Sequence, residues 1–504
     1  MRKSILALLA LALVLALGGS AFAAKDSLVV ADQYDATMFD PVRHNDYPSS
    51  RACHQVYDTL IFLNDDGTFR PGLAEKWEFV SDTAYKMYLR KGVKFHNGED
   101  LKAEDVKFSL ERATTEVGAH IKTYSQDLDN VEIVDDYTVI LHLKKVNFPF
   151  FASLAHSWGS IVNKKEVEAQ GENYGTPAGT AVGTGPFKFV SWQKSDRYTL
   201  ERFDDYWDEK AKFKTLVLRS IPEPTARTVG LETGEVDIAY PMINNDISRI
   251  EENEALVLQR KPLASTTYMG FNTQTPPFDN PEVRKAITIA IDREAALDVV
   301  YQGLGRVPTS PLLPINNYFP EPVPVEYDPD KAKEMLDKAG VKDLAFTIYT
   351  NENKQRKDYA EVIQNMLSEL DIKVEIQVLE WGTFLDQLKA GKLPVFMIGW
   401  SASDINPDPD AYIKAAMHSK FAGPSNRVWL KDAEVDELLD KGTVTPDGPE
   451  RAEIYKRFCD RVNELNPWCY LAIADTLYGT NKALKGADNF YRGIINRLDG
   501  VYYE

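Results

Sequence analysis

The side chains that most often do chemistry are present in this chain, but their spacing does not fit a catalytic motif. The seven histidines include no i,i+4 pair and no His-Glu-x-x-His, so the pattern of a helical zinc site is missing. The sequence also lacks Gly-x-Ser-x-Gly, the turn that presents a nucleophilic serine in many hydrolases. We therefore predict a protein that is not an enzyme and that holds no cofactor and no metal ion. A hydrolase acting through two carboxylates is the alternative, because such a pair leaves no recognisable motif.

Two glycine-containing segments are also unlike nucleotide sites. Gly391-Lys392-Leu393 has neither the hydroxyl residue nor the upstream glycine of a phosphate loop. The glycine-rich stretch 175–185 departs from the dinucleotide fingerprint, and we expect its glycines to serve tight turns.

The composition is that of a folded, acidic protein. The chain has 504 residues, 44% of them hydrophobic and 27% charged, which is enough for about three domains. Its net charge of −18 argues against partners such as nucleic acid or anionic lipid, since both require a basic surface. Three cysteines permit at most one disulfide. Cys459 and Cys469 could form this bridge, or they could remain two separately buried thiols.

The first 23 residues have the pattern of a secretory signal peptide. Arg2 and Lys3 precede an apolar run over 5–17, and Ala21-Phe22-Ala23 resembles a cleavage site. No cysteine lies near that point, the first being Cys53. We expect export, cleavage of residues 1–23, and a freely diffusing periplasmic protein that is not a lipoprotein.

The two halves of the mature chain differ in the pattern of their hydrophobic residues. The first half is typical of strands with a helix inserted at 103–112. In the second half, Asn280-Pro281 and Asp328-Pro329 are typical helix starts. Strands and helices are then expected in alternation at 344–350, 357–370, 373–379, 383–390 and 395–400. Such alternation predicts crossover connections and an α/β fold.

A set of short motifs follows a single order along nearly the whole mature chain. They are Leu73-Ala74-Glu75-Lys76-Trp77, Leu89-Arg90-Lys91-Gly92-Val93-Lys94-Phe95-His96-Asn97-Gly98, Ala103-Glu104-Asp105-Val106-Lys107-Phe108-Ser109, Gly183-Thr184-Gly185-Pro186-Phe187, Asn272-Thr273 with Pro276-Pro277-Phe278, Val283-Arg284-Lys285-Ala286 through Ile291-Asp292-Arg293-Glu294, and Gly399-Trp400 with Asp408-Pro409-Asp410. Together they resemble the family 5 extracytoplasmic solute-binding proteins, which serve ABC importers of peptides, nickel and related solutes.

The resemblance implies a two-lobed periplasmic-binding-protein-like α/β fold with an extra domain inserted in the first lobe. The first lobe would use 24–57, 182–266 and 480–504, the inserted domain 58–181, and the second lobe 267–479. The ligand would be enclosed between the lobes, which close about a hinge.

The same resemblance implies five ligand-binding candidates. The amine-binding acid of peptide binders follows a Gly-Trp, where this chain offers Asp404, with Asp408 as the competitor. Both acids could instead cap or stiffen a proline-rich loop. Trp381 and Trp400 match aromatic positions that line the pocket, although either could pack in the core. The familiar carboxylate anchors are absent, so Arg356 is a substitute, or else a solvated residue near a helix start.

The function implied is capture of a small solute, above all a peptide or peptide-like molecule, and its delivery to an ABC transporter permease by a monomeric receptor. The same role for a nickel chelate or a sugar is an alternative, because relatives bind metal through a chelator. The rivals from other classes are the secreted hydrolase named above and an export-pathway chaperone with a peptide-accepting cleft.

Overall fold

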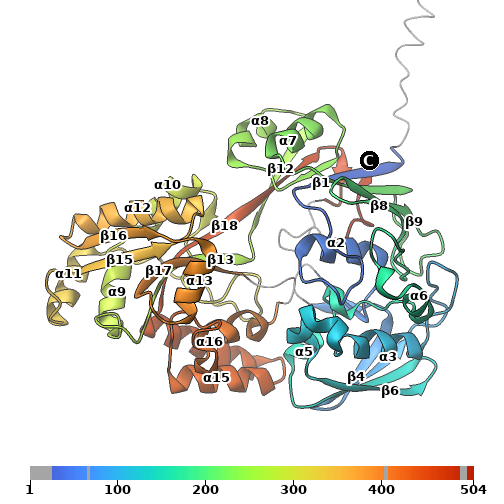
Figure 1. Ribbon diagram of the computed structural model, residues 1–504, viewed down its shortest axis with the longest axis horizontal. Helices are drawn as coiled ribbons and strands as arrows, with labels where there is room; N and C mark the ends of the chain where they lie inside the picture. The colour runs from blue at the N-terminus through green and yellow to red at the C-terminus, as the bar shows by residue number, and fades with distance from the viewer. Residues whose placement is uncertain (1–24, 65–67, 402–406, 488–496) are drawn as a thin grey trace, which may run out of the picture.

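The computed structural model describes residues 25–64, 68–401, 407–487 and 497–504. Two lobes lie side by side and are joined near one end, as Figure 1 shows. Within those described ranges, every helix is too short or too polar to cross a bilayer. The fold is mixed α/β, as the sequence predicted.

The first lobe, here residues 25–57, 182–262 and 476–504, is built on a mixed sheet. Its central strand β1 (Ser27–Asp32) pairs in parallel with its neighbours on both sides, β10 and β11. The other elements are β8 (Phe187–Gln193), β9 (Arg197–Arg202), β10 (Thr215–Ser220), β11 (Ile238–Tyr240), β12 (Leu256–Pro262), α2 (Tyr47–Val56), α7 (Pro224–Thr233), α8 (Ile247–Glu251), and the short pair β19 (Leu484–Lys485) and β20 (Tyr502–Tyr503).

Residues 58–181, the expected inserted domain, supply nearly all of one hydrophobic cluster and a four-stranded antiparallel sheet. That sheet has the order β4 (Ala74–Ser81), β5 (Ala84–Leu89), β7 (Thr138–Leu143) and β6 (Leu128–Asp135). Helix α3 (Ala103–Arg112) has the predicted bounds and buries Val106 and Leu110. The remaining elements are β2 (Ile61–Leu63), β3 (Phe69–Pro71), α4 (Lys122–Ser125), α5 (Pro149–Ser153) and α6 (Lys164–Gln170).

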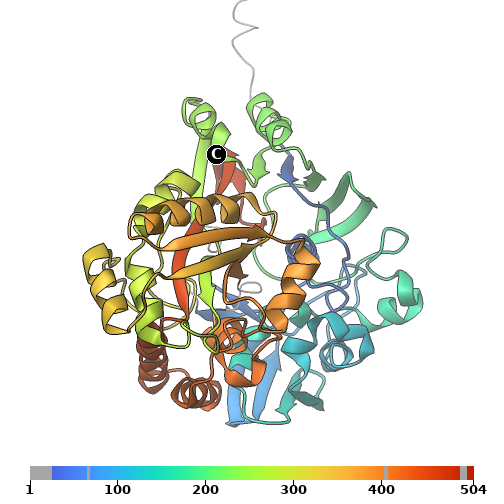
Figure 2. The same ribbon diagram turned by 60° about the vertical axis from the view of Figure 1, so that its left-hand side comes forward.

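The second lobe, residues 265–472, shows the predicted alternation of strands and helices. Asn280 and Asp328 accept backbone hydrogen bonds at the starts of α9 (Pro281–Ile289) and α11 (Pro329–Lys338), so both predicted helix starts are confirmed. In Figure 2 this lobe comes forward and its helices surround the strands. The other elements are β13 (Ser265–Phe271), α10 (Arg293–Tyr301), β14 (Gly305–Arg306), β15 (Ala345–Thr350), α12 (Lys354–Ser368), β16 (Lys373–Val378), α13 (Trp381–Lys389), β17 (Val395–Ser401), a π-helical turn Asp410–Lys414, α14 (Ala415–Met417), α15 (Ala433–Val444) and α16 (Pro449–Leu465).

One long strand, β18 (Trp468–Asn481), belongs to both lobes. Its first part pairs with β13 of the second lobe as far as Ala472, and from Asp475 onward it pairs with β12 of the first lobe. The chain therefore crosses between lobes at 263–264 and at 473–475. The sequence predicted a second lobe of residues 267–479, with the later crossing after residue 479. In the structure, residues 475–479 already pair with β12 and so belong to the first-lobe sheet. The other domain boundaries stay predictions.

The glycine-rich stretch 175–185 closes against the end of α2. The Gly185 N–H donates to the Val56 carbonyl at 2.9 Å, and a Cβ at Gly183 would lie 2.2 Å from that oxygen. The His96 ring receives the Gly183 N–H on Nδ1 at 3.3 Å and lies 2.9 Å from the Gly185 carbonyl through Nε2. Two motifs that are 87 residues apart thus meet. The glycines allow the backbone of this stretch to lie close to the backbone at the end of α2.

All three cysteines are free and buried. Cys459 lies in one hydrophobic cluster of the second lobe and Cys469 in another. Burial raises the pKa of the Cys459 thiol to about 12, which keeps it protonated and unreactive at neutral pH. The structure therefore shows Cys459 and Cys469 as two separately buried thiols and not as a disulfide.

Candidate functional site

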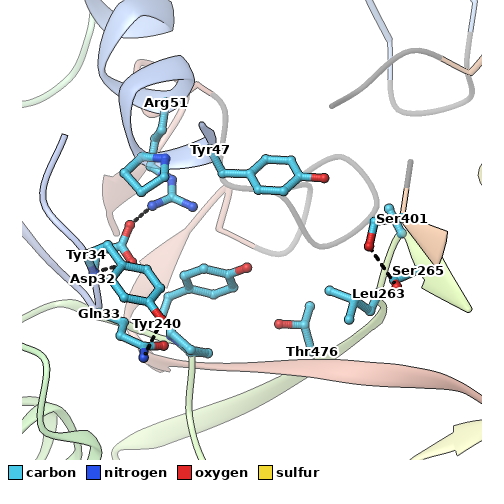
Figure 3. Close-up of a pocket in the computed structure, with 13 residues that line it drawn as sticks. Asp32, Gln33, Tyr34, Tyr47, Arg51, Tyr240, Leu263, Ser265, Ser401 and Thr476 are labelled. Carbon is cyan, nitrogen blue, oxygen red and sulfur yellow. Dashed lines mark hydrogen bonds and ion pairs between the residues drawn. The ribbon is translucent and has the colours of Figure 1, made fainter. Parts of the chain in front are cut away.

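A cavity of about 340 Å³ lies where the two lobes meet. First-lobe residues form one side, and Ser265 and Ser401 of the second lobe form part of the other. Leu263 and Ala264 of one strand crossing and Thr476, just after the other crossing, also line the cavity. Figure 3 shows tyrosine side chains on one side of the space, and Ser265, Ser401 and Thr476 on the other. This volume is at the small end of the range for ligand pockets.

The sheet topology explains this location. In the first lobe, β1 ends at Asp32 and β11 at Tyr240, and these parallel strands point their carboxyl ends at the cavity. In the second lobe, β15, β16 and β17 run parallel, and β17 ends at Ser401. Ligands of open α/β sheets bind beyond the carboxyl ends of the strands. Here two such edges face one cavity.

The first-lobe side combines an ion pair with aromatic rings. The Arg51 guanidinium pairs with the Asp32 carboxylate, and its carbon lies 5.1 Å from the centre of the Tyr240 ring. Arg51 is only 3% exposed, so this pair is fixed before any ligand arrives. Tyr34 and Tyr47 are 62% and 40% exposed, large fractions for aromatic side chains. Their rings offer an apolar surface with a polar tip.

The opposite side carries hydroxyl groups near exposed strand ends. The Ser401 hydroxyl donates to the Ser265 hydroxyl at 2.9 Å, and the Ser265 hydroxyl lies 3.3 Å from the Trp400 carbonyl. A Cβ at Gly399 would lie 3.7 Å from the Ser265 hydroxyl and 3.4 Å from Nη2 of Arg356. The guanidinium of Arg356 is therefore close to this wall of the cavity.

Arg356 and Trp381 lie together at the carboxyl edge of the second-lobe sheet. Each is in the first turn of the helix that follows its strand, and the Arg356 guanidinium carbon is 5.8 Å from the centre of the Trp381 ring. Nη1 of Arg356 donates to the Asn351 side chain at 3.0 Å, and no carboxylate of the described ranges lies within 4 Å of Arg356. Burial lowers the pKa of the Arg356 guanidinium. A partly buried cation without an acidic partner is suited to an anion.

Trp400 has a different environment. Its indole N–H donates to the Tyr412 carbonyl at 2.7 Å, and its half-buried ring packs against a hydrophobic cluster of the second lobe. The indole donor is thus used within the protein. This matches the core-packing alternative more closely than a pocket wall, although Trp400 adjoins Ser401.

The structure describes only one of the two acidic candidates. Asp404 lies outside the described residues, and its role stays a prediction. Asp408 is 4% exposed and forms two hydrogen bonds with Arg451, at 2.8 and 3.0 Å. It also accepts the Asp410 N–H at 2.9 Å, at the start of the π-helical turn. Asp408 therefore stiffens the proline-containing loop, and its burial against Arg451 argues against the competing ligand role.

Sequence reasoning missed the first-lobe wall. Asp32, Tyr34, Tyr47, Arg51 and Tyr240 come from three separate segments, and none belongs to a motif that names a ligand. One signal was available, because Asp32 follows a short apolar strand and could have been placed at a carboxyl edge. In the part of the chain that the structure describes, no group of three or more His, Cys, Asp or Glu is arranged to hold a metal ion.

Comparison with known proteins gives the family. The family model of bacterial extracellular solute-binding proteins, family 5 Middle, matches residues 68–423. Heme-binding protein A of Haemophilus influenzae is 31% identical over 449 residues, covering 83% of this chain and 81% of that protein. Glutathione-binding protein GsiB of Escherichia coli (strain K12) is 29% identical over 493 residues, covering 95% of each.

The fold agrees with a solved relative. The periplasmic binding protein DppA of Helicobacter pylori, associated with an ABC transporter and solved with the peptide STSA, superposes with a TM-score of 0.76 at 29% identity. The match covers 95% of this chain and 98% of that one. With the expected two-lobed fold and the motif set both confirmed, the chain belongs to the family 5 bacterial extracellular solute-binding proteins.

Proposed function

We propose that this protein captures a peptide or peptide-like solute between its lobes and delivers it, unchanged, to the permease of an ABC importer. The observation that carries the proposal is the cavity between two carboxyl sheet edges, with tyrosines on one side and hydroxyls and a guanidinium near the other. Aromatic rings accept varied side chains, whereas the polar groups suit the backbone and termini of a peptide. Two of the ligands named for relatives, glutathione and the peptide STSA, are of this class, whereas the heme named for a third relative is not.

The family and the N-terminal sequence support a proposal for where the protein works. We infer that residues 1–23 direct export and are removed, and that the mature protein works as a monomer in the periplasm without a lipid anchor. Asp404 is proposed to meet the ligand's amino group, because it follows Gly399-Trp400 one place later than the amine-binding acid of peptide-binding relatives.

The test uses two mixtures of di- to pentapeptides, one with free carboxyl termini and one with amidated termini. The free-acid mixture should raise the melting temperature of the mature protein, since a ligand at 100 times its Kd adds about 2.7 kcal/mol of stability. Mass spectrometry of the bound fraction should recover intact peptides. Absence of any shift would contradict the peptide assignment, and recovery of cleaved peptides would favour a hydrolase.

Arg356 gives a second prediction, that it binds the carboxyl terminus of the ligand. Arg356→Met should weaken binding of free-acid peptides roughly 10- to 100-fold, because a charge-assisted hydrogen bond is lost. Binding of amidated peptides should change little. Isothermal titration of the tightest peptides from each mixture measures both.

Lys354→Met is the matched control, since Lys354 lies on the same helix, is 76% exposed, and pairs with Asp358. It should leave both affinities near wild type. Equal losses for acid and amide peptides in the Arg356 variant would mean that this residue supports the lobe and binds no carboxylate.

A further inference from the structure

The strand crossings join the first lobe to the second lobe. The inserted domain contacts the second lobe at another place, far from these crossings. The Phe148 N–H donates to the Thr443 carbonyl at 3.1 Å. Phe148 immediately precedes α5, and Thr443 lies one residue before the end of α15. Figure 1 shows α5 beside α15 and α16 at the bottom of the molecule, with β12 and the crossings toward the top. The lobes are thus attached at both ends of the space between them.

Both partners of this hydrogen bond are held by their own domains. Next to Phe148, the Asn147 side chain donates to Asp127 at 2.7 Å, and the Asn147 carbonyl accepts the Tyr85 hydroxyl at 3.3 Å. Across the contact, the Thr443 hydroxyl donates to Asp410 Oδ1 at 2.6 Å. Since donor and acceptor are fixed in this way, the bond joins two rigid bodies.

Two ion pairs at the contact form within single domains, while Lys145 of the insert and Lys420 of the second lobe repel each other across it. A cavity of about 220 Å³ beside the bond is lined by both domains. On the insert side, Lys145 lies 3.3 Å from Asp127, and on the second-lobe side Lys414 lies 3.7 Å from Asp410. The backbone hydrogen bond is therefore a specific link that does not depend on attraction between charges of the two domains.

We propose that the Phe148–Thr443 contact is a clasp that holds the lobes together on the side away from the crossings, and that opening of the cleft requires it to break. The strand crossings act as the hinge. Rotation about a hinge displaces the most distant points furthest, and a hydrogen bond is lost within a small increase in distance. The clasp consequently biases the protein toward the closed arrangement even when no solute is bound.

The test compares two substitutions at one position. Phe148→Pro removes the N–H donor, and the observed φ of −66° suits the proline ring. Phe148→Ala removes the same aromatic ring and keeps the N–H, so the difference between the variants reports the hydrogen bond. Spin labels on Val80→Cys and Val299→Cys, which are 57% and 67% exposed, measure the separation of the two bodies. The native cysteines are buried and should not be labelled.

In the ligand-free mature protein, Phe148→Pro should raise the ratio of open to closed distances about five-fold over Phe148→Ala, as expected for one neutral hydrogen bond. Thr443→Val, which frees the acceptor residue from Asp410, should shift the ratio in the same direction by less. Identical distance distributions for the proline and alanine variants would overturn the proposal. Should the proline variant fail to fold, an unchanged distribution in Thr443→Val would overturn it as well.

Discussion

Replacing Asp58 with asparagine should lower the free energy of unfolding by about 3–5 kcal/mol, the loss typical when one partner of a buried charge pair is removed. Asp58 is fully buried at the junction of the first lobe and the inserted domain. Its carboxylate accepts four hydrogen bonds, from Thr184 at 3.1 Å, Tyr206 at 3.2 Å, Trp207 at 2.8 Å and Arg497 at 2.9 Å. Asparagine removes the charge that faces Arg497 and turns an amide donor toward other donors.

Differential scanning calorimetry of the mature chain would measure this loss. Asp208→Asn is the matched control, because Asp208 is 43% exposed and lies 3.7 Å from Arg70. A surface pair of this kind contributes about 1 kcal/mol or less. An Asp58 variant as stable as the Asp208 variant would show that the four donors find other acceptors.

Acidification from pH 7 to pH 5 should destabilise the protein by about 4 kcal/mol through two buried histidines. Burial lowers the pKa of both His54 and His156 to about 3. In the unfolded chain these groups take up protons near pH 6.5, whereas in the folded chain they stay neutral. Stability is therefore full above pH 6.5 and falls as the pH drops from there toward 3. Carboxylates contribute mainly below this window, so pH 5–7 reports the histidines. His96, whose pKa burial lowers to about 4, adds roughly another 2 kcal/mol that a His54, His156 double variant keeps.

Urea denaturation at pH 7, 6 and 5 measures the slope. A His54→Gln, His156→Gln double variant should be less stable at pH 7 and show a flatter slope than wild type. His120 is exposed, so His120→Gln should keep the wild-type slope. A wild-type stability that stays constant from pH 7 to pH 5 would contradict the prediction.

Local patterns in the sequence were enough to place most elements of the second lobe. Helices α9 and α11 begin where an Asn or Asp cap precedes proline, and α3 has its predicted bounds. These signals act within a few residues, so they can be recognised without knowledge of distant partners. Strand β18 shows the limit, because nothing in its residues says that pairing passes from β13 to β12 near residue 473. That change depends on partners about 200 residues away.

The candidate site was harder to predict because it is assembled from distant edges. Arg356 and Trp381 were found through the resemblance, and the structure brings them together. The sequence leaves Trp400 either as a pocket wall or as a core residue, and in the structure its indole N–H donates to the Tyr412 carbonyl. Asp408 was weighed as a ligand group, but a sequence cannot show that Arg451, 43 residues on, neutralises it. The tyrosines of the first-lobe wall had no signal of their own, since exposed and core tyrosines look alike in sequence.

The position of β18 near the end of the chain bears on the order in which the protein can fold. A chain made from its N-terminus presents β1, β10 and β11 long before β18, the strand that pairs with β11 and β12. The Asp58 carboxylate must likewise await Arg497, 439 residues later. Such long-range pairing makes folding slow. The first lobe therefore cannot reach its native state until nearly the whole polypeptide is available, and the chain stays incompletely folded for most of its synthesis.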